Sequence, residues 1–364
     1  MPASFHDEPF DEGTLTKLEL FHRYAEAWLP VFVARHELIW PEVNIFDFFA
    51  GAGTDSTGAE GSPLRLLRVI EGQRKYLSRA DLRVSLHLSD AHAGKVAQLN
   101  RTLAARRTEG LPVRIDVQRA DFATRFAAVK GEITKRSSAN LLIIDQFGVK
   151  EVPDDTFAQI IGFETTDVLF FVSSATFRRF GHVPEVARLA LPGYQRPSDH
   201  YRAHMAVADA YRKLVPSGKR YHVASFSIKK GSNVYGVIFG SAHPLGMDKF
   251  LEVAWDQNKV SGDADFDVHR EGIQPDAPLL FAEMNVPSKV KIFEEELEKE
   301  ILTGACPNEL KMIEICHRHG VRRKHAEPVL VKLKQSKQIE CSFRVPDIDR
   351  LKAPRAIKLI ASAK

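Results

Sequence analysis

The residues best placed to do chemistry are a carboxylate and two glycines that follow an apolar run near the start of the chain. The run covers residues 43–47 and ends in Asp47, and Gly51 and Gly53 follow it, separated by one residue. An uninterrupted run of Val, Ile and Phe predicts a buried strand, and the glycines allow the backbone to turn sharply and to approach a ligand closely. In an α/β sheet such a turn lies at the carboxyl end of the strand, where nucleotide-like cofactors bind. An ordinary glycine turn in an α/β domain would show the same pattern.

Two classes of nucleotide site use a glycine turn of this kind. The dinucleotide fingerprint of dehydrogenases has a third glycine, but Ser56 stands at that position. It also has an acid about 20 residues further on, whereas the next acid that closes a strand is the more distant Asp90. The strand, the acid and the Gly-x-Gly pattern together instead resemble motif I of S-adenosylmethionine (SAM) methyltransferases. This resemblance implies SAM as the cofactor, and the missing third glycine and the distant acid disfavour a nicotinamide oxidoreductase.

Two further acids stand at or just beyond the ends of predicted strands. Asp90 ends the alternating run 83–90, where a carboxylate can accept both hydroxyls of a ribose. Asp121 and Phe122 follow a third strand, and an acid with an adjacent aromatic suits the amino group and the ring face of adenine. His87 lies within the alternating run, and we expect it to be structural. The predicted cofactor-binding residues are Asp47, Gly51, Gly53, Asp90, Asp121 and Phe122.

The fourth predicted strand, 140–145, leads into Asp145-Gln146-Phe147-Gly148. Its run is fully apolar before the acid, as the centre of a parallel sheet requires, so Asp145 would lie next to the first strand. Amino-methylating enzymes have Asp or Asn, two prolines and an aromatic here, where the acid holds the target amino group and the aromatic stacks on the base. In this chain Gln146 replaces a proline and Phe147 comes one residue early. Asp145, Gln146 and Phe147 are the predicted catalytic residues, with a purely structural acid as the alternative.

These residues require a sheet that brings the strand ends together. The apolar runs predict parallel strands at 43–47, 83–90, 113–117, 140–145 and 167–172, followed by a hairpin with strands at 221–228 and 234–240. An antiparallel last pair after five parallel strands favours the α/β, SAM-methyltransferase-like Rossmann sheet. Helical periodicity predicts helices at 14–35, from Ser62 onward, at 204–214 and at 246–255. Pro30 is expected to kink or divide the first of these, and Ser62 to be an N-cap.

Other features restrict the setting of the protein. Lys17 and Tyr24 lie two turns apart in the first helix, and we expect them on the surface rather than in the site. Cys306, Cys316 and Cys341 match neither a zinc site nor a disulfide framework, so we expect buried thiols in a reducing cytoplasm. The sequence predicts no metal site. It shows no signal pattern near its start and no run of about 18 apolar residues, so no membrane span is expected.

Basic charge is concentrated near the end of the chain. The 364 residues have a formal net charge of +4, and from residue 285 onward there are 17 Lys and Arg against 11 Asp and Glu. Helices at 288–303, 308–319 and 322–337 with a strand at 339–343 predict a winged helix. We therefore predict a Rossmann domain over 1–260, a linker over 261–287, a winged-helix domain over 288–345 and a basic tail over 346–364.

Two segments are candidates for contact with nucleic acid. One has two arginines between phenylalanines, which could grip a phosphate and a base together. The other is the third helix of the predicted winged helix, whose basic residues could lie along a duplex backbone. The predicted nucleic-acid-binding residues are Arg178, Arg179, Arg322, Arg323, Lys324 and Lys332. Solvated or protein-contacting side chains are the alternative for both segments.

Five separated motifs resemble the three-Cys-motif partner (TcmP) proteins of bacteria. They are Lys17 with Tyr24, residues 47–53, Gly61-Ser62-Pro63-Leu64, Asp145-Gln146-Phe147-Gly148 and residues 239–246. The resemblance implies a methyltransferase-like Rossmann fold, a C-terminal winged helix and a radical-SAM-like partner that carries three cysteines. That family has proline where this chain has Gln146.

Two hypotheses about function follow. The first is SAM-dependent methyl transfer to a nucleic acid, together with the three-Cys partner. The second is a non-catalytic partner or recruiting protein, with a degenerate Rossmann domain and a winged helix that binds nucleic acid or protein. Gln146 favours the second hypothesis.

Overall fold

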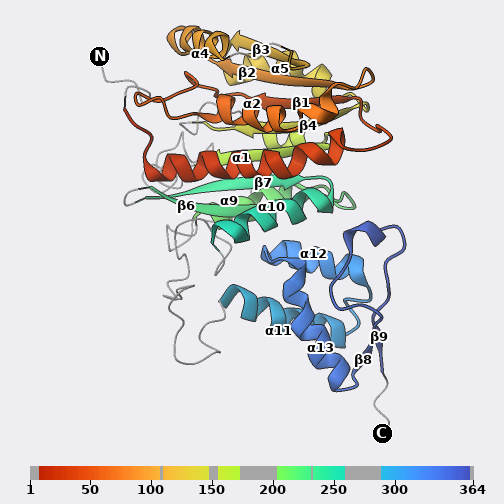
Figure 1. The fold of residues 1–364 in the computed structure, drawn as a ribbon. Helices are drawn as coiled ribbons and strands as arrows, with labels where there is room; N and C mark the ends of the chain where they lie inside the picture. Colours follow the sequence, from red (N-terminus) through yellow and green to blue (C-terminus); the bar gives the residue numbers. More distant parts are fainter. Residues whose placement is uncertain are drawn as a thin grey trace.

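A seven-stranded sheet forms the centre of the protein (Figure 1). The structure is a computed structural model that describes residues 8–106, 110–146, 155–172, 203–230, 233–258 and 288–360. The strands are β1 (Glu42–Asp47), β2 (Arg83–Asp90), β3 (Val113–Arg119), β4 (Ser138–Ile144), β5 (Thr166–Val172), β6 (His222–Lys230) and β7 (Asn233–Ser241). Their order is β3-β2-β1-β4-β5-β7-β6, and β7 is antiparallel to both of its neighbours whereas the other pairs are parallel. The predicted α/β sheet, mostly parallel with an antiparallel last pair, is confirmed.

Helices cover both faces of the sheet, and each face buries its own apolar cluster. The helices on one face are α1 (Glu12–Val33), α2 (Ser62–Gly72), α4 (Ala93–Ala105) and α10 (Pro244–Gln257), with the single turn α3 (Arg74–Leu77) after α2. Those on the other face are α5 (Phe122–Ile133), α6 (Thr156–Ile161) and α9 (Ala203–Leu214). Ile45 and Phe46 are adjacent in β1 yet belong to different clusters, because successive side chains of a strand point to opposite faces.

Two details of the helices differ from the sequence-based expectation. Helix α1 continues through Pro30 as one helix to Val33. Pro30 lies in the last turn. Its missing N–H therefore removes one hydrogen bond near the end of the helix and leaves the earlier turns unaffected. Ser62 is the first residue of α2 and Gly61 is its N-cap, so Ser62 is not the cap that we predicted. Its hydroxyl has another partner, described below.

The C-terminal part forms three helices and a two-stranded ribbon (Figure 1). These are α11 (Ser288–Leu302), α12 (Glu309–His319), α13 (Glu327–Gln335), β8 (Ile339–Glu340) and β9 (Lys358–Leu359). The predicted helix 322–337 is divided, because a 3₁₀ turn, Arg323–Ala326, precedes α13 and Pro328 lies in the first turn of α13. The strand predicted at 339–343 is only the two residues of β8. Its partner β9 and a 3₁₀ turn, Ile348–Arg350, come from the range predicted as a tail.

The C-terminal helices pack against the side of the sheet that ends in β6, the outermost strand. Helix α12 contacts β6 and α10, and the Trp255 indole donates a hydrogen bond to the carbonyl of Gly320 at 3.1 Å. The apolar side chains of α11, α12 and α13 are continuous with the larger cluster of the sheet. The predicted linker, 261–287, lies outside the described residues, and the division into domains stays a prediction. Cys306 and Cys316 are buried as expected, whereas Cys341 is only half-buried. Within the described part of the chain, no helix is both long and apolar enough to cross a membrane.

Candidate active site

The predicted glycines form a tight turn at the carboxyl end of β1. Gly51 and Gly53 have φ angles of 66° and 89°, a left-handed region that residues with a Cβ rarely adopt. The carbonyl of Gly53 accepts a hydrogen bond from the N–H of Gly61 at 2.8 Å, which closes the loop between β1 and α2. A Cβ on Gly53 would lie 3.0 Å from Leu99 Cδ1. Glycine is therefore favoured at position 53 for both its conformation and its small size.

Asp47 ends β1 and is fully buried. Its carboxylate accepts hydrogen bonds from Ser62 Oγ at 2.6 Å and from the N–H of Phe49 at 3.1 Å. Burial raises the pKa of Asp47 to about 7; the two hydrogen bonds oppose the shift, and Asp145 and Asp90 add to it. Asp145 and Asp90 therefore act electrostatically on Asp47 at the carboxyl ends of three adjacent strands, β2, β1 and β4.

Asp90 ends β2 and connects to the glycine turn. Its Oδ2 accepts from the N–H of Gly51 at 3.2 Å, and its Oδ1 accepts from the N–H of His92 at 2.8 Å. Lys95 Nζ lies 4.0 Å from Oδ2. A carboxylate has about four lone-pair sites, so Asp90 can accept further donors, such as a pair of hydroxyls, while it holds the turn.

Asp145 follows β4 directly and forms a buried ion pair with Lys17 of α1. Lys17 Nζ lies 2.8 Å from Oδ1 and 2.6 Å from Oδ2 of Asp145, and it also lies 4.5 Å from the centre of the Phe171 ring. Lys17 is only 5% exposed, so the prediction that it lies on the surface is wrong. Helix α1 packs across the sheet with this side chain facing the end of β4, where the ammonium finds a carboxylate.

Gln146 and Phe147 were predicted to act with Asp145. Gln146 is buried, and within the described residues no group donates a hydrogen bond to its Oε1. Buried carbonyl oxygens are nearly always hydrogen-bonded, so this oxygen is well suited to accept an N–H or O–H from a bound molecule. Phe147 lies outside the described residues.

Tyr24, the second residue of α1 predicted on the surface, is also buried. Its hydroxyl donates to Asp167 Oδ2 at 2.6 Å. Asp167 lies near the start of β5. This contact is therefore at the amino ends of the parallel strands, opposite the carboxyl ends where Asp47 and Asp145 lie. The prediction of a surface position is again wrong, because α1 spans the sheet from one edge to the other.

Asp121 and Phe122 occupy different environments. Asp121 is exposed and is the N-cap of α5, where it accepts from the N–H of Thr124 at 2.8 Å. Phe122 is buried between α5 and the sheet, and its ring stacks on Phe49 with the centres 5.9 Å apart. Phe49 is only partly buried and lies two residues before Gly51. The aromatic ring closest in sequence to the glycine turn is thus Phe49, which we did not predict as a site residue.

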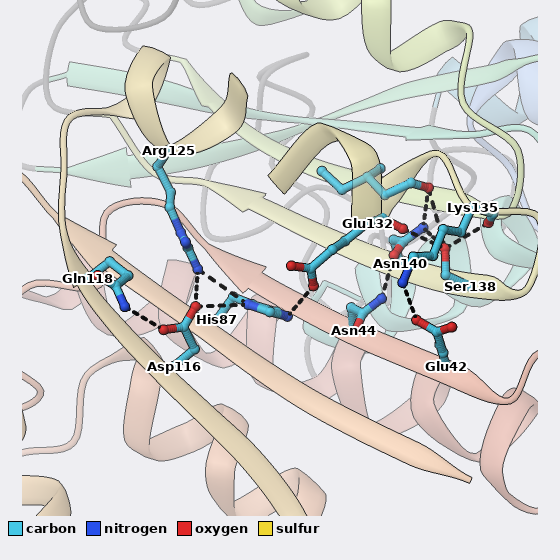
Figure 2. A network of polar contacts seen from close by, with 11 residues as sticks. Glu42, Asn44, His87, Asp116, Gln118, Arg125, Glu132, Lys135, Ser138 and Asn140 are labelled. Carbon is cyan, nitrogen blue, oxygen red and sulfur yellow. Dashed lines mark hydrogen bonds and ion pairs between the residues drawn. The ribbon is translucent and has the colours of Figure 1, made fainter. Parts of the chain in front are cut away.

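His87 lies within β2 and is structural, as expected. Its ring stacks on Phe46 with the centres 4.5 Å apart. Figure 2 shows its polar neighbours: Asp116 Oδ2 at 3.4 Å, Arg125 Nη2 at 3.3 Å and Glu132 Oε2 at 3.5 Å. Burial lowers the pKa of His87. This network ties α5 to the sheet.

The predicted nucleic-acid-binding residues are held in several ways. Arg323 forms a two-pronged ion pair with Asp248 of α10 at 2.8 and 2.9 Å, and Arg322 lies 2.8 Å from Glu252 of the same helix. Lys332 lies 2.7 Å from Glu298 of α11, and Lys324 is exposed. Arg178 and Arg179 lie outside the described residues. The two arginines at the start of the divided third helix therefore fasten the C-terminal part to α10.

The strand order and the glycine turn with its carboxylates define the methyltransferase-like class of Rossmann proteins. No family model and no curated protein matches the chain. Among solved structures, Trm1 from Pyrococcus horikoshii in complex with S-adenosyl-L-methionine is similar over 99% of this chain and 94% of its own, at 12% identity and a TM-score of 0.38. A SAM-dependent methyltransferase from Agrobacterium tumefaciens is similar over 64% of this chain and 62% of its own, at 8% identity and a TM-score of 0.33.

The structure adds residues that sequence reasoning missed. Lys17 and Ser62 contact the predicted acids directly, at 2.6 Å in each case. Both belong to motifs that carry the resemblance to the TcmP family, and this resemblance is the signal in the sequence that connects them with the site. Periodicity alone could not, because a lysine and a serine near the polar side of a helix are usually solvated.

Proposed function

We propose that the protein is a SAM-dependent methyltransferase that acts on an amino group of a nucleic acid. The observation that carries the proposal is the grouping of Asp47, Asp90 and Asp145 at the carboxyl ends of adjacent strands, next to the Gly51–Gly53 turn. Ligands of open α/β sheets bind at this edge, and close approach of the backbone at the glycines suits a nucleotide-like cofactor.

The residues of the turn fit the parts of SAM. Asp90 retains acceptor capacity for two ribose hydroxyls, and the left-handed glycines leave room for the methionine part. Phe49 supplies a partly buried ring for the adenine face, with Asp121 exposed at the start of α5 for its amino group. When bound, the cofactor supplies a methyl group on a sulfonium centre, which is already activated for transfer.

The chain's own part in the reaction is to position the acceptor. Lys17 holds Asp145 by both carboxylate oxygens, so that carboxylate has a fixed direction. Gln146 Oε1 offers a second acceptor beside it. An amino group that donates one N–H to each oxygen would be held with its lone pair toward the methyl group, and such alignment is the main source of rate in a transfer of this kind.

The nucleic-acid substrate and the partner are further parts of the proposal. We place nucleic acid against the C-terminal helices, where Lys324 is exposed and Lys332 lies at the surface. The three-Cys radical-SAM-like partner is proposed from the resemblance to the TcmP family, and the winged-helix assignment of this part has the same basis. In this arrangement the C-terminal part recruits and the sheet edge catalyses.

Calorimetric titration of SAM into the purified protein tests the proposal. We expect a saturable signal that Asp90→Asn weakens by about tenfold or more, because it removes one charged acceptor of a ribose hydroxyl. Asp81→Asn is the matched control, since Asp81 is an exposed carboxylate before β2, at the other edge of the sheet. Asp145→Asn combined with Lys17→Met, which leaves no buried charge without a partner, should bind SAM nearly normally yet lose transfer of labelled methyl groups to total RNA or DNA. Absence of any SAM signal in the unaltered protein would contradict the proposal.

One observation favours the second candidate, a non-catalytic partner protein. Lys17 already satisfies both oxygens of Asp145, so an incoming amino group must share that carboxylate with an ammonium. In a recruiting subunit this ion pair would simply lock α1 onto β4. Binding of the three-Cys partner without any SAM signal would support this second function.

A further inference from the structure

A cavity of about 240 Å³ lies at the edge of the sheet opposite the candidate active site. Its walls come from the last turns of α1, the start of β5, the end of β7 and the first turns of α10. The residues that matter for its chemistry are Trp28, Phe32, Arg35, Trp40, His243 and Lys249, and we call the cavity they line the aromatic pocket. None of the residues proposed to act in methyl transfer lines this cavity.

Three aromatic rings form one side of the aromatic pocket. The rings of Trp28 and Phe32 have centres 4.7 Å apart and are inclined by 50°, and those of Phe32 and Trp40 are 5.4 Å apart and inclined by 78°. Phe32 and Trp40 are only partly buried. Inclined aromatic walls of this kind suit a flat apolar ring, which can lie against one face and one edge at once. The small volume limits the occupant to a ring system with a short side arm.

Two basic side chains that line the aromatic pocket are placed to hold an anion. Arg35 and Lys249 both line it, and the guanidinium of Arg35 already lies 5.5 Å from the Trp40 ring centre, the place that a cationic ligand would take. Two acids also line the pocket. Glu164 is exposed, and its negative charge opposes the binding of an anion. Asp167 is buried and accepts from Tyr24, and burial raises its pKa to about 6. The hydrogen bond from Tyr24 shows that the Asp167 carboxylate is turned toward a donor of the protein itself.

His243 adds a neutral donor to the same cavity. Its Nδ1 accepts a hydrogen bond from the N–H of Leu245 at 3.1 Å, so in the neutral ring the proton is on Nε2. Burial lowers the pKa of His243, and Arg220 and Arg35 lower it further. The imidazole is therefore neutral near pH 7 and can donate from Nε2 to a carboxylate.

We propose that the aromatic pocket binds a small aromatic carboxylate, with its ring against Trp28, Phe32 and Trp40 and its carboxylate toward Lys249, Arg35 and His243. The site is distinct from the edge that carries Asp47, Asp90 and Asp145, and the proposal does not depend on methyltransferase activity. Helix α1 joins the two edges, since it carries Lys17 at one and Trp28 at the other.

Calorimetry with two probes of the same ring and opposite charge tests the proposal. We expect indole-3-acetate to bind the full-length protein at pH 7.5 with a saturable signal and tryptamine to bind at least tenfold more weakly. Lys249→Met should weaken indole-3-acetate about tenfold, because it removes a charged hydrogen-bond donor but keeps the apolar stem. Lys291→Met is the matched control, since Lys291 is an exposed lysine of α11 outside the cavity.

Each contrary result overturns the proposal in its own way. Equal or tighter binding of tryptamine would show a cation site, and no binding of either probe at millimolar concentration would show that the cavity takes no such ring. Binding that Lys249→Met and Trp40→Leu leave unchanged would place the probe elsewhere on the protein. Lys249 is half-buried and does not belong to the hydrophobic core, so its variant should fold normally, and an unchanged midpoint of thermal unfolding would confirm this.

Discussion

At the scale of single residues, the candidate site depends on charges that are removed from water. Lys17 and Asp145 have side chains that are 6% and 12% exposed, and Asp47 is fully buried beside two other carboxylates. Burial of a charge is unfavourable unless a partner or a proton compensates it. The two acids use different compensation: Asp145 has an ammonium, whereas Asp47 has hydrogen bonds and a raised pKa.

Replacement of Lys17 by Met should destabilise the protein strongly. The change leaves Asp145 buried without its partner, and breaking a buried pair in this way costs about 3–5 kcal/mol. Urea unfolding of the single variant and of Lys17→Met with Asp145→Asn measures the effect. The double variant should recover part of the loss, because no uncompensated charge remains. If both variants lost the same stability, the ion pair would not be the cause.

The raised pKa of Asp47 predicts a pH-dependent penalty in the absence of ligand. Its pKa is 3.8 when unperturbed and about 7 in the fold, so between these values the folded protein binds more protons than the unfolded chain, and stability falls as pH rises. Asp47→Asn removes this term. The variant should match the unaltered protein near pH 4 and become progressively more stable than it up to pH 7. A constant difference between the two across pH 4–8 in urea unfolding would contradict the assignment.

At the scale of the elements, α1 and α10 determine how the two edges of the sheet are built. Helix α1 places Lys17 at Asp145 and Tyr24 at Asp167, which are at opposite edges. Helix α10 approaches Asp167 so closely that a Cβ at position 246 would clash with the side chains of Ser241 and Asp167. On its other side α10 carries the acids that pair with Arg322 and Arg323.

Glycine-to-alanine substitutions should have opposite effects in two helices. A Cβ at Gly246 would lie 2.5 Å from Ser241 Oγ and 2.9 Å from Asp167 Oδ2, so Gly246→Ala should destabilise by about 2 kcal/mol through overpacking. Gly131 lies in α5 with no atom within 4 Å of a Cβ, so Gly131→Ala should stabilise by about 1 kcal/mol. Thermal unfolding of both variants checks this. A stabilising Gly246→Ala would refute the close approach.

Loss of Arg323 should loosen the C-terminal part alone. Its ion pair with Asp248 is partly exposed, so we expect a cost of only about 1 kcal/mol after solvent screening. Hydrogen exchange should speed up in α12 and α13 of Arg323→Ala, while β1 and β4 remain protected. Arg350→Ala is the control, because Arg350 is exposed and lies 3.7 Å from Asp347. Equal exchange in the two variants would show that Arg323 does not hold the interface.

At the scale of the whole molecule, the basic C-terminal part lies apart from the predicted cofactor site. The C-terminal helices lie against β6 and α10, at one end of the strand order, whereas the predicted cofactor site is centred on β2, β1 and β4. Arg322 and Arg323, two of the basic residues that suggested nucleic-acid contact, form ion pairs within the protein with Glu252 and Asp248. Contact with a polyanion would then depend on the lysines that face solvent.

Salt dependence should show whether those lysines contact phosphates. Affinity for RNA or DNA should fall steeply with salt, and Lys324→Ala and Lys332→Ala should each reduce the slope by about 1, because each removes about one phosphate contact. Fluorescence anisotropy across a salt series measures the slope, with Lys75→Ala as a control on a surface of the sheet domain. A flat response in the unaltered protein would indicate protein contact instead.

The sequence by itself determined the sheet and its glycine turn. Apolar and alternating runs predicted all seven strands and the antiparallel last pair, because burial leaves a local pattern in the residues of each strand. The strand ends placed Asp47 and Asp90 correctly relative to Gly51 and Gly53. These features are local, so neighbouring residues suffice to reveal them.

Only the tertiary structure decided which residues surround those acids. Lys17 pairs with Asp145 from 128 residues away, and Tyr24 with Asp167 from 143 residues away, and no local pattern encodes such contacts. The same reason explains Arg322 and Arg323, which follow a helical pattern typical of a duplex contact but meet the acids of α10. Whether a charged side chain faces solvent or belongs to a site depends on the residues that lie opposite it in space. Those residues are determined by how the helices pack.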